Sequence, residues 1–258
     1  RLYEKAAMAT TPWRGAVGRF ASACVDVVAS CGCVVCGGTV AAGPGRALCG
    51  ACEPIVDPGR ERCRRCGATL GPRLPAVDEC PHCVNDRLSF QTAYALGNYD
   101  GRLREAVVRA KTRGGPPVAG HLARLLVGRY GDALRGESAA CVTAVPRHWT
   151  RRLATDHDAA DVIARVVAGG IGVAYRPGLL VQYRRSGKQA GTTRTARKAA
   201  LGEHFRVGRR AAALDGATVI LCDDVLTTGT TASRCAKVLR EAGVGRVVVA
   251  VLARSTGP

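Results

Sequence analysis

Residues 219–231 read Val-Ile-Leu-Cys-Asp-Asp-Val-Leu-Thr-Thr-Gly-Thr-Thr, and their order indicates which class of fold to expect. The apolar residues 219–221 predict a short buried strand, and residues 231–241 carry apolar side chains at helical spacing. A loop between a strand and a helix is a phosphate site in open α/β sheets, because the helix N-terminus presents unpaired N–H groups and a positive dipole end. Gly229 allows close backbone approach, and hydroxyl donors come from Thr227, Thr228, Thr230 and Thr231.

Two adjacent acids stand at the strand end, just before the threonines. Asp223 and Asp224 would repel a phosphate, but their oxygens can accept hydrogen bonds from the vicinal hydroxyls of a sugar and favour a divalent cation. The stretch therefore predicts a ribose-phosphate site. We call residues 223–231 the signature loop. The alternative interpretation is an acidic turn capped by threonines.

The signature loop resembles the phosphoribosyl-pyrophosphate (PRPP) signature of type I phosphoribosyltransferases. That resemblance implies PRPP binding with Mg²⁺ by Asp223, Asp224, Val225, Leu226, Thr227, Thr228, Gly229, Thr230 and Thr231. Purine-salvage enzymes of that superfamily usually carry a third Asp where this chain has Thr227. The departure argues against ordinary purine salvage.

Eight of the 13 cysteines fall into four Cys-x-x-Cys pairs. The pairs are Cys33 with Cys36, Cys49 with Cys52, Cys63 with Cys66, and Cys80 with Cys83. Two such pairs complete a four-sulfur tetrahedral site with no open position, so we expect one or two structural Zn²⁺ ions. Sequential grouping is the simplest arrangement, and interleaved grouping is the alternative. His82 is a possible substitute ligand, although Cys83 is the better candidate.

The remaining composition bounds the domains and partners. The chain has 258 residues, a length that is enough for one core domain and a smaller module. Its formal net charge is +18. Basic residues are concentrated between positions 176 and 210, where a polyanion such as pyrophosphate or a nucleic-acid backbone would be attracted. We find neither an apolar run long enough to span a membrane nor the layout of a signal peptide, and expect a cytoplasmic protein.

The segment after residue 88 predicts an α/β domain. Helices are expected from the turn at residues 99–101 to residue 111, around residues 121–130 and over residues 158–168, and strands over residues 140–145, 179–181, 219–221 and 247–252. Strands that alternate with helices imply a parallel sheet. We therefore expect an N-terminal extension at residues 1–23, a zinc-ribbon module at residues 24–88, and the α/β domain at residues 89–258.

The order of these motifs resembles the ComF family, phosphoribosyltransferase-like proteins associated with DNA uptake in natural competence. The resemblance covers residues 24–254: zinc pairs, a Tyr-Asp-Gly-x-Leu-Arg helix, a Val-Pro strand end and the PRPP signature. It implies a type I phosphoribosyltransferase fold, a parallel sheet flanked by helices, behind a small zinc ribbon. It also implies that the loop after Val145, Pro146 and Arg147 meets pyrophosphate.

Further phosphate or loop contacts are expected at five residues, and all of them except Lys188 are matched to positions of that family. The candidates are Lys111, Arg152, Lys188, Gln189 and Arg197. Where the family usually reads Arg-Gly-Phe-Asn-Gln, residues 152–157 read Arg-Leu-Ala-Thr-Asp-His. Lys111 could support a phosphate, or it could be a helix C-terminal cation worth about 0.3 to 1 kcal/mol.

An active transferase would work by positioning and by electrostatic stabilisation of the leaving pyrophosphate, with Asp223, Asp224 and Arg147 as catalytic candidates. No residue pattern specifies the acceptor. The alternative from another class is a non-catalytic zinc protein that binds single-stranded DNA, although aromatic residues make up only 4% of the chain and stacking platforms are scarce. A third interpretation is a zinc module that docks a partner such as a helicase-like DNA-uptake protein.

Overall fold

The computed structural model describes residues 32–40, 48–55, 61–71, 79–146, 158–183, 204–208 and 214–255. The strands are β1 (Thr92–Asn98), β2 (Cys141–Ala144), β3 (Leu180–Tyr183), β4 (His204–Val207), β5 (Thr218–Leu226) and β6 (Arg246–Arg254). The helices are η1 (Glu53–Ile55), α2 (Gly101–Ala110), α3 (Pro116–Gly136), α5 (Ala159–Ile171) and α7 (Thr230–Glu241). No described helix has the length and apolar character that crossing a membrane requires.

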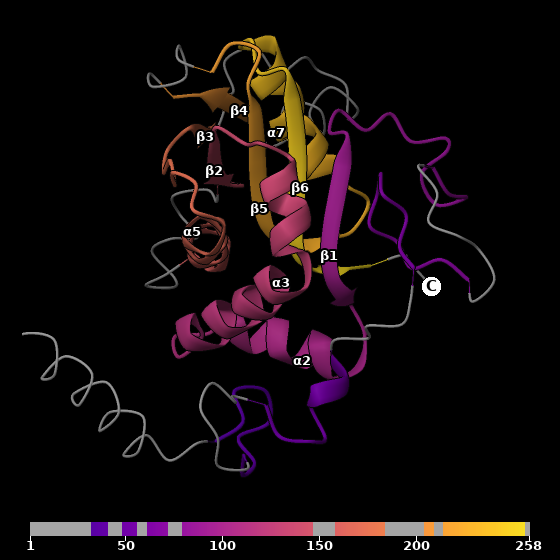
Figure 1. Cartoon of the computed structure of the whole chain (residues 1–258), viewed down its shortest axis with the longest axis vertical. Coiled ribbons are helices and arrows are strands. Elements are labelled where there is room, and N and C mark those ends of the chain that lie inside the picture. The colour runs from indigo at the N-terminus through magenta and orange to yellow at the C-terminus, as the bar shows by residue number, and fades with distance from the viewer. Residues whose placement is uncertain are drawn as a thin grey trace, which may run out of the picture.

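A four-stranded parallel sheet of order β1-β6-β5-β2 forms the centre of the molecule (Figure 1). One face is covered by α2, α3 and α5, whose side chains form a core with Ile220 and Val248. The other face is covered by α7, whose Leu239 packs with Val219 and Val249. Coverage on both faces explains why β6 is almost continuously apolar, as is typical of parallel sheets.

Local sequence sets the ends of the helices. Asp158 caps α5, with its Oδ1 accepting a hydrogen bond from the Ala160 N–H at 3.2 Å, and Gly172 ends that helix in the left-handed conformation at φ 73°. Helix α3 has proline at its N-terminal positions, where the missing N–H costs nothing. It is therefore longer than the helix predicted around residues 121–130.

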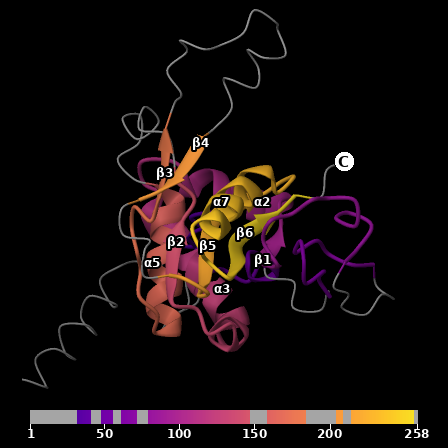
Figure 2. The same cartoon turned by 90° about the horizontal axis from the view of Figure 1, so that it is seen from above.

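The parallel α/β fold is confirmed, with two differences in the predicted strands. Strand β5 continues past residue 221 to Leu226, because Asp223 and Val225 keep their parallel pairing with β6. The strand expected at residues 179–181 lies outside the parallel sheet and pairs antiparallel with β4 as a hairpin. Figure 2 shows this hairpin, whose Phe205 packs in the same core cluster as Leu239 of α7.

Two strands, β1 and β4, were not predicted from the pattern. Strand β1 reads Thr-Ala-Tyr-Ala-Leu-Gly-Asn, in which alanine, glycine and asparagine have weak strand preference. Its pairing with β6, from Thr92 with Val248 to Asn98 with Arg254, is what holds it extended.

Candidate functional site

The signature loop begins inside β5, where successive side chains point to opposite faces of the sheet. Asp224 points toward the face that α2 covers and is only 7% exposed. Its Oδ1 lies 3.1 Å from Nζ of Lys111, the residue that ends α2. A buried carboxylate is costly without a partner, and this ion pair supplies one. The structure thus places Lys111 at the site, paired with an acid.

Asp223 points to the opposite side and is half-buried. Its Oδ1 accepts a hydrogen bond from the Asp224 N–H at 2.8 Å. Desolvation, followed by the neighbouring charge of Asp224, raises the pKa of Asp223 to about 8, against the lowering effect of that hydrogen bond and of Lys111. Near neutral pH the pair therefore keeps a proton that a bound divalent cation could displace.

The second half of the loop forms the N-terminus of α7. Gly229 is the N-cap residue, with φ 75°, and has no side chain that could cap the helix. The Thr228 hydroxyl oxygen accepts a hydrogen bond from the Thr230 N–H at 3.3 Å and lies 2.8 Å from the Thr230 hydroxyl oxygen, and both side chains are exposed. A helix start at a glycine, flanked by exposed hydroxyls, has the donors that a phosphate group needs.

Gly229 also has little space around it. A Cβ at this position would lie 3.1 Å from Cδ2 of Leu88 and 3.6 Å from the ring of Phe90. These two residues follow the last cysteine pair in the chain. The start of α7 is therefore packed directly against the segment that leaves the zinc-ribbon region.

A cavity of about 440 Å³ lies at the carboxyl end of β2. Its lining includes Pro146, Asp158, Asp161 and Tyr175. The Val145 N–H donates to the Cys222 carbonyl at 2.9 Å, so this strand end is tied to β5 one residue before Asp223. The cavity is therefore lined by the strand end where the family resemblance places pyrophosphate, whereas Asp223 and Asp224 are not among its lining residues.

The eight cysteines of the four pairs gather in two groups, and the grouping is sequential. We call Cys33, Cys36, Cys49 and Cys52 the first cysteine unit, and Cys63, Cys66, Cys80 and Cys83 the second cysteine unit. Within each unit all four Sγ atoms lie within 4.8 Å of one another. His82 is exposed, whereas Cys83 is buried within its unit.

The sulfur geometry fits zinc. Sγ–Sγ separations are 3.6 Å for Cys36 with Cys49, 3.7 Å for Cys63 with Cys83, and 3.6 Å for Cys66 with Cys80. A tetrahedron with Zn–S bonds of about 2.3 Å has edges of about 3.8 Å. Each unit could therefore hold one ion through four thiolates.

The two units contact different parts of the α/β domain (Figure 1). At the first unit, Arg102 of α2 donates to Cys52 Sγ at 3.2 Å, and Arg109 of the same helix donates to the Val35 carbonyl. At the second unit, the Arg64 carbonyl accepts from the Ala93 N–H of β1 at 2.9 Å, and Thr69 donates to Asn98 Oδ1 at 2.5 Å.

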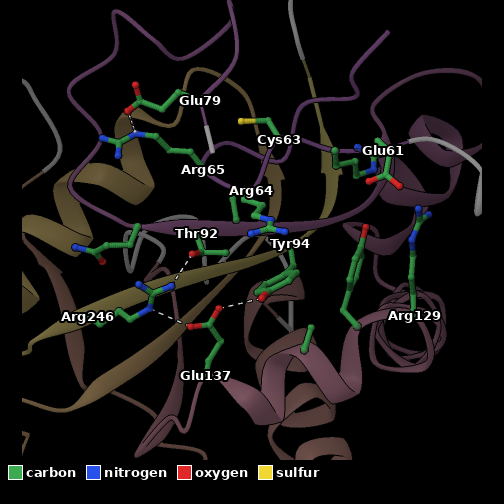
Figure 3. A pocket seen from close by; sticks show the side chains of 15 residues that line it. Glu61, Cys63, Arg64, Arg65, Glu79, Thr92, Tyr94, Arg129, Glu137 and Arg246 are labelled. Atoms are coloured by element: carbon green, nitrogen blue, oxygen red, sulfur yellow. Dashed lines mark hydrogen bonds and ion pairs between the residues drawn. The ribbon is translucent and has the colours of Figure 1, made fainter. Parts of the chain in front are cut away.

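A second cavity, of about 1030 Å³, lies between the second cysteine unit, β1 and α3 (Figure 3). We call it the arginine-rich cavity, because its lining includes Arg62, Arg64, Arg65, Arg129 and Arg246. Tyr94 and Tyr130 also line it, with ring centroids 5.3 Å apart. Arg246, at the start of β6, pairs with Glu137 at 2.9 Å, so the cavity lies at the opposite end of the sheet from the signature loop.

The predicted site residues divide into those that the structure brings together and those outside the described residues. The structure brings together Lys111, Asp223 and Asp224, with Pro146 nearby at the end of β2. The predicted residues outside the described part of the chain are Arg147, Arg152, Lys188, Gln189 and Arg197.

One site residue was missed by sequence reasoning. Arg254, at the end of β6, is 5% exposed and donates through its NH1 to the backbone carbonyls of Leu226 and Thr227. The available signal was a single arginine ending an apolar strand beside the signature strand. Its position there became meaningful only once the two strands were known to be neighbours.

Comparison with known proteins identifies the domain. The phosphoribosyl transferase domain family matches residues 158–257. The DNA utilization protein YhgH of Salmonella typhi is 26% identical over 216 residues, covering 81% of this chain and 90% of that protein. Competence protein F of Haemophilus influenzae is 24% identical over 211 residues, covering 81% of this chain and 90% of that protein.

Among solved structures, the glutamine PRPP amidotransferase of B. subtilis in complex with ADP and GMP is 23% identical, with a TM-score of 0.36. The match covers 59% of this chain and 31% of that enzyme. The chain thus contains a phosphoribosyl transferase domain and has homologues named for competence and DNA utilization. The resemblance to the ComF family is confirmed by these relatives.

Proposed function

We propose that this phosphoribosyltransferase-like chain binds PRPP with Mg²⁺ at the signature loop and serves DNA uptake in natural transformation. The observation that carries the proposal is the Asp223–Asp224 pair, in which Asp224 is paired with Lys111, just before a helix that starts at Gly229 between exposed threonine hydroxyls. The names of the relatives, competence protein F and DNA utilization protein, support the cellular role. The acceptor of a phosphoribosyl group is left open.

Each part of the loop has a role in this proposal. The 5′-phosphate lies against the N–H groups of the first turn of α7 and the hydroxyls of Thr228 and Thr230. Asp223 and Asp224 accept hydrogen bonds from the ribose hydroxyls and are the donors for Mg²⁺, which supplies positive charge for the pyrophosphate when bound. Pro146, at the end of β2, faces the pyrophosphate, and the family resemblance assigns Arg147 to the same role.

Transfer of a phosphoribosyl group does not require a strong base from the protein. Loss of pyrophosphate leaves an oxocarbenium-like ribose, so positioning and electrostatic stabilisation of the leaving group supply the rate enhancement. We propose that an acceptor reaches the ribose through the cavity at the end of β2, whose lining includes Pro146.

We also propose one structural Zn²⁺ in each cysteine unit, on the Sγ geometry described above. The proposed modules are residues 1–23, 24–88 and 89–258. Cysteine thiolates persist in a reducing compartment, so we propose a cytoplasmic location.

Calorimetric titration of metal-loaded protein with PRPP and Mg²⁺ tests the main proposal. The test variant is Asp223→Ala with Asp224→Ala. The control variant is Asp132→Ala with Glu241→Ala, which removes two exposed acids, one in α3 and one at the C-terminal end of α7, opposite the loop. Binding by the wild type and the control, lost in the test variant, is the expected result. Absence of binding by the wild type would contradict the proposal.

A second candidate function is the binding of single-stranded DNA, and the arginine-rich cavity favours it. Arginines pair with phosphates, and two tyrosine rings offer surface for base stacking. Fluorescence anisotropy with a labelled oligonucleotide tests it in Arg64→Ala with Tyr94→Ala. Weaker DNA binding with unchanged PRPP binding is the expected result, and unchanged DNA binding would exclude this cavity. A helicase-like partner is the other proposed ligand of the zinc region.

A further inference from the structure

Arg254 is a buried arginine whose guanidinium donates to a group of backbone oxygens. Its Nε donates to the Cys66 carbonyl at 2.9 Å, and its NH1 donates to the Leu226 carbonyl at 3.1 Å and to those of Thr227 and Ser255. Cys66 belongs to the second cysteine unit, and Leu226 and Thr227 belong to the signature loop. One side chain therefore joins the metal-binding region to the loop.

The chemistry of the guanidinium suits this task. Its donors are fixed in one plane, so a carbonyl bonded to Nε and a carbonyl bonded to NH1 are held at a set separation. Lysine has a single nitrogen on a flexible stem and cannot impose that geometry. Burying a cation is costly, and the group of carbonyl oxygens around it compensates.

A second connection runs beside the first. The Ser89 N–H donates to Ser233 Oγ of α7 at 2.9 Å. Leu88 packs against the core of the second cysteine unit and against the position where Gly229 would carry a Cβ. The start of α7 is thus connected to the second cysteine unit through residues 88–89. Leu226 and Thr227, which precede α7 in the signature loop, are connected to the same unit through Arg254.

The position of the Cys66 carbonyl depends on its own side chain. In the second cysteine unit, the Cys63 carbonyl accepts from Gly67 N–H at 2.8 Å, and the Cys63 N–H donates to the Ala68 carbonyl at 2.8 Å, forming a tight hairpin around the sulfurs. Such small cysteine hairpins have few buried apolar groups and take their order from the metal. Loss of the metal would release the carbonyl that Arg254 holds.

We infer that Arg254 is a positioning residue that fixes the signature loop on the second cysteine unit, so that metal binding at that unit sets the affinity of the loop for PRPP. The inference rests on the proposed function for its ligand. Neither the family match nor the relatives' names give the zinc ribbon this role. The role is that metal binding at the second cysteine unit positions the backbone of the loop that binds phosphate.

The test compares Arg254→Lys with Arg240→Lys. Arg240 is exposed and also donates to a backbone carbonyl, that of Gly245 at 3.2 Å, at the opposite end of α7. In metal-loaded protein, Arg254→Lys is expected to raise the Kd for PRPP by about tenfold or more, as loss of hydrogen bonds from a charged donor implies, and Arg240→Lys by less than about twofold. Equal affinities of wild type and Arg254→Lys would overturn the inference.

Hydrogen exchange keeps the inference testable without PRPP. In the wild type, removal of metal with a chelator is expected to speed exchange at residues 226–230, while residues 247–251 of β6 stay protected and report that the sheet is folded. In Arg254→Lys these loop amides are expected to exchange fast before metal is removed and to change little afterwards. The same response to the chelator in both proteins would overturn the inference.

These two readouts separate the possible failures. If the wild type does not bind PRPP but the exchange pattern is as expected, the proposed function fails and the coupling between Arg254 and the metal unit stands. If Arg254→Lys does not fold, as loss of protection at the β6 amides would reveal, Ser233→Ala gives the milder break. Loss of the hydrogen bond from the Ser89 N–H is expected to speed exchange at the Ser89 amide and at the start of α7, and not elsewhere. Unchanged exchange there would count against the inference.

Discussion

The two cysteine units share a local sequence but differ in burial and in what they contact. Each opens with Cys-x-x-Cys-Gly-x-Thr, and each hairpin places its glycine, Gly37 or Gly67, in the left-handed conformation. In the first unit Cys36 is exposed, whereas all four cysteines of the second unit are buried. The first unit contacts α2, and the second contacts the sheet edge and, through Arg254, the backbone of the signature loop.

The two units, which share the Cys-x-x-Cys-Gly-x-Thr motif, thus support the signature loop and its carboxylates through different contacts. The first unit holds α2, and α2 ends at Lys111, the cation beside Asp224. The second unit holds the carbonyls of the signature loop through Arg254. Because a phosphate is bound by several backbone N–H groups together, displacement of the backbone should cost more affinity than displacement of one cation.

Removal of the metal ligands of one cysteine unit at a time is expected to give the largest change in the Kd for PRPP. Cys66→Ser with Cys80→Ser is expected to raise the Kd for PRPP about a hundredfold, because several loop donors lose their alignment. Cys36→Ser with Cys49→Ser should raise it about tenfold or less. Calorimetry and metal analysis measure affinity and the loss of one zinc per chain. Equal losses of affinity in the two variants would contradict the proposed difference between the units.

Gly229→Ala breaks the contact between the second unit and the helix start. The left-handed φ of 75° costs a non-glycine residue about 1 to 2 kcal/mol, and the new Cβ meets Leu88 at 3.1 Å. We expect about a tenfold rise in the Kd for PRPP. Gly172→Ala, at the end of α5 with φ 73° and open space, is the matched control. It should lower the melting temperature by a similar amount and leave PRPP binding unchanged; parallel losses of binding would refute the contact.

Lys111→Met tests the contribution of the first cysteine unit, which acts on the site through α2. It removes the cation of the first unit's route, and we expect about a fivefold rise in the Kd for PRPP, since the pair is partly exposed and screened by solvent. Lys237→Met, which breaks the exposed pair with Glu241, is the control. Titration of both variants by calorimetry checks the difference. An affinity in Lys111→Met equal to that of the control would remove Lys111 from the site.

The raised pKa of Asp223 predicts a pH dependence of PRPP affinity, which is the smallest of the expected changes in affinity. An ordinary Asp titrates near 3.9, and the folded chain holds this proton up to about pH 8, so the contribution of Asp223 to stability is greatest below about pH 3.9 and is lost as pH rises through that window. PRPP binding to the ionised carboxylate has the opposite trend. Between about pH 7.5 and about pH 8.5 the affinity should rise about threefold.

Asp223→Asn separates this effect from other titrations. It should remove the fall in stability between about pH 6 and about pH 8, measured by denaturant unfolding, because unfolding then releases no proton from this side chain. A wild-type stability that rises with pH over this range would show that Asp223 is ionised in the folded chain.

The parts of the fold that depend on neighbours in sequence could be predicted. The strand, acid pair and helix start at residues 219–231 are local, as is the spacing of the cysteine pairs. Strand β1 and the extension of β5 through Asp223 could not be, because pairing with β6 overrides the weak strand preference of alanine and aspartate.

The candidate site shows the same limit. The ion pair of Lys111 with Asp224 joins residues on α2 and β5, and its partner acid was not evident from the helix pattern alone. Arg254 joins residues 188 and 28 positions away, Cys66 and Leu226. Contacts of that range follow from sheet order, which the strand pattern leaves undetermined.

A crystal structure of the zinc-loaded protein with PRPP and Mg²⁺ tests the central claim most directly. We predict the 5′-phosphate at the first turn of α7, the ribose hydroxyls at Asp223 and Asp224, and the Arg254 side chain bridging Cys66 and Leu226 beneath the loop. PRPP bound in the arginine-rich cavity, with the signature loop empty, would contradict the account.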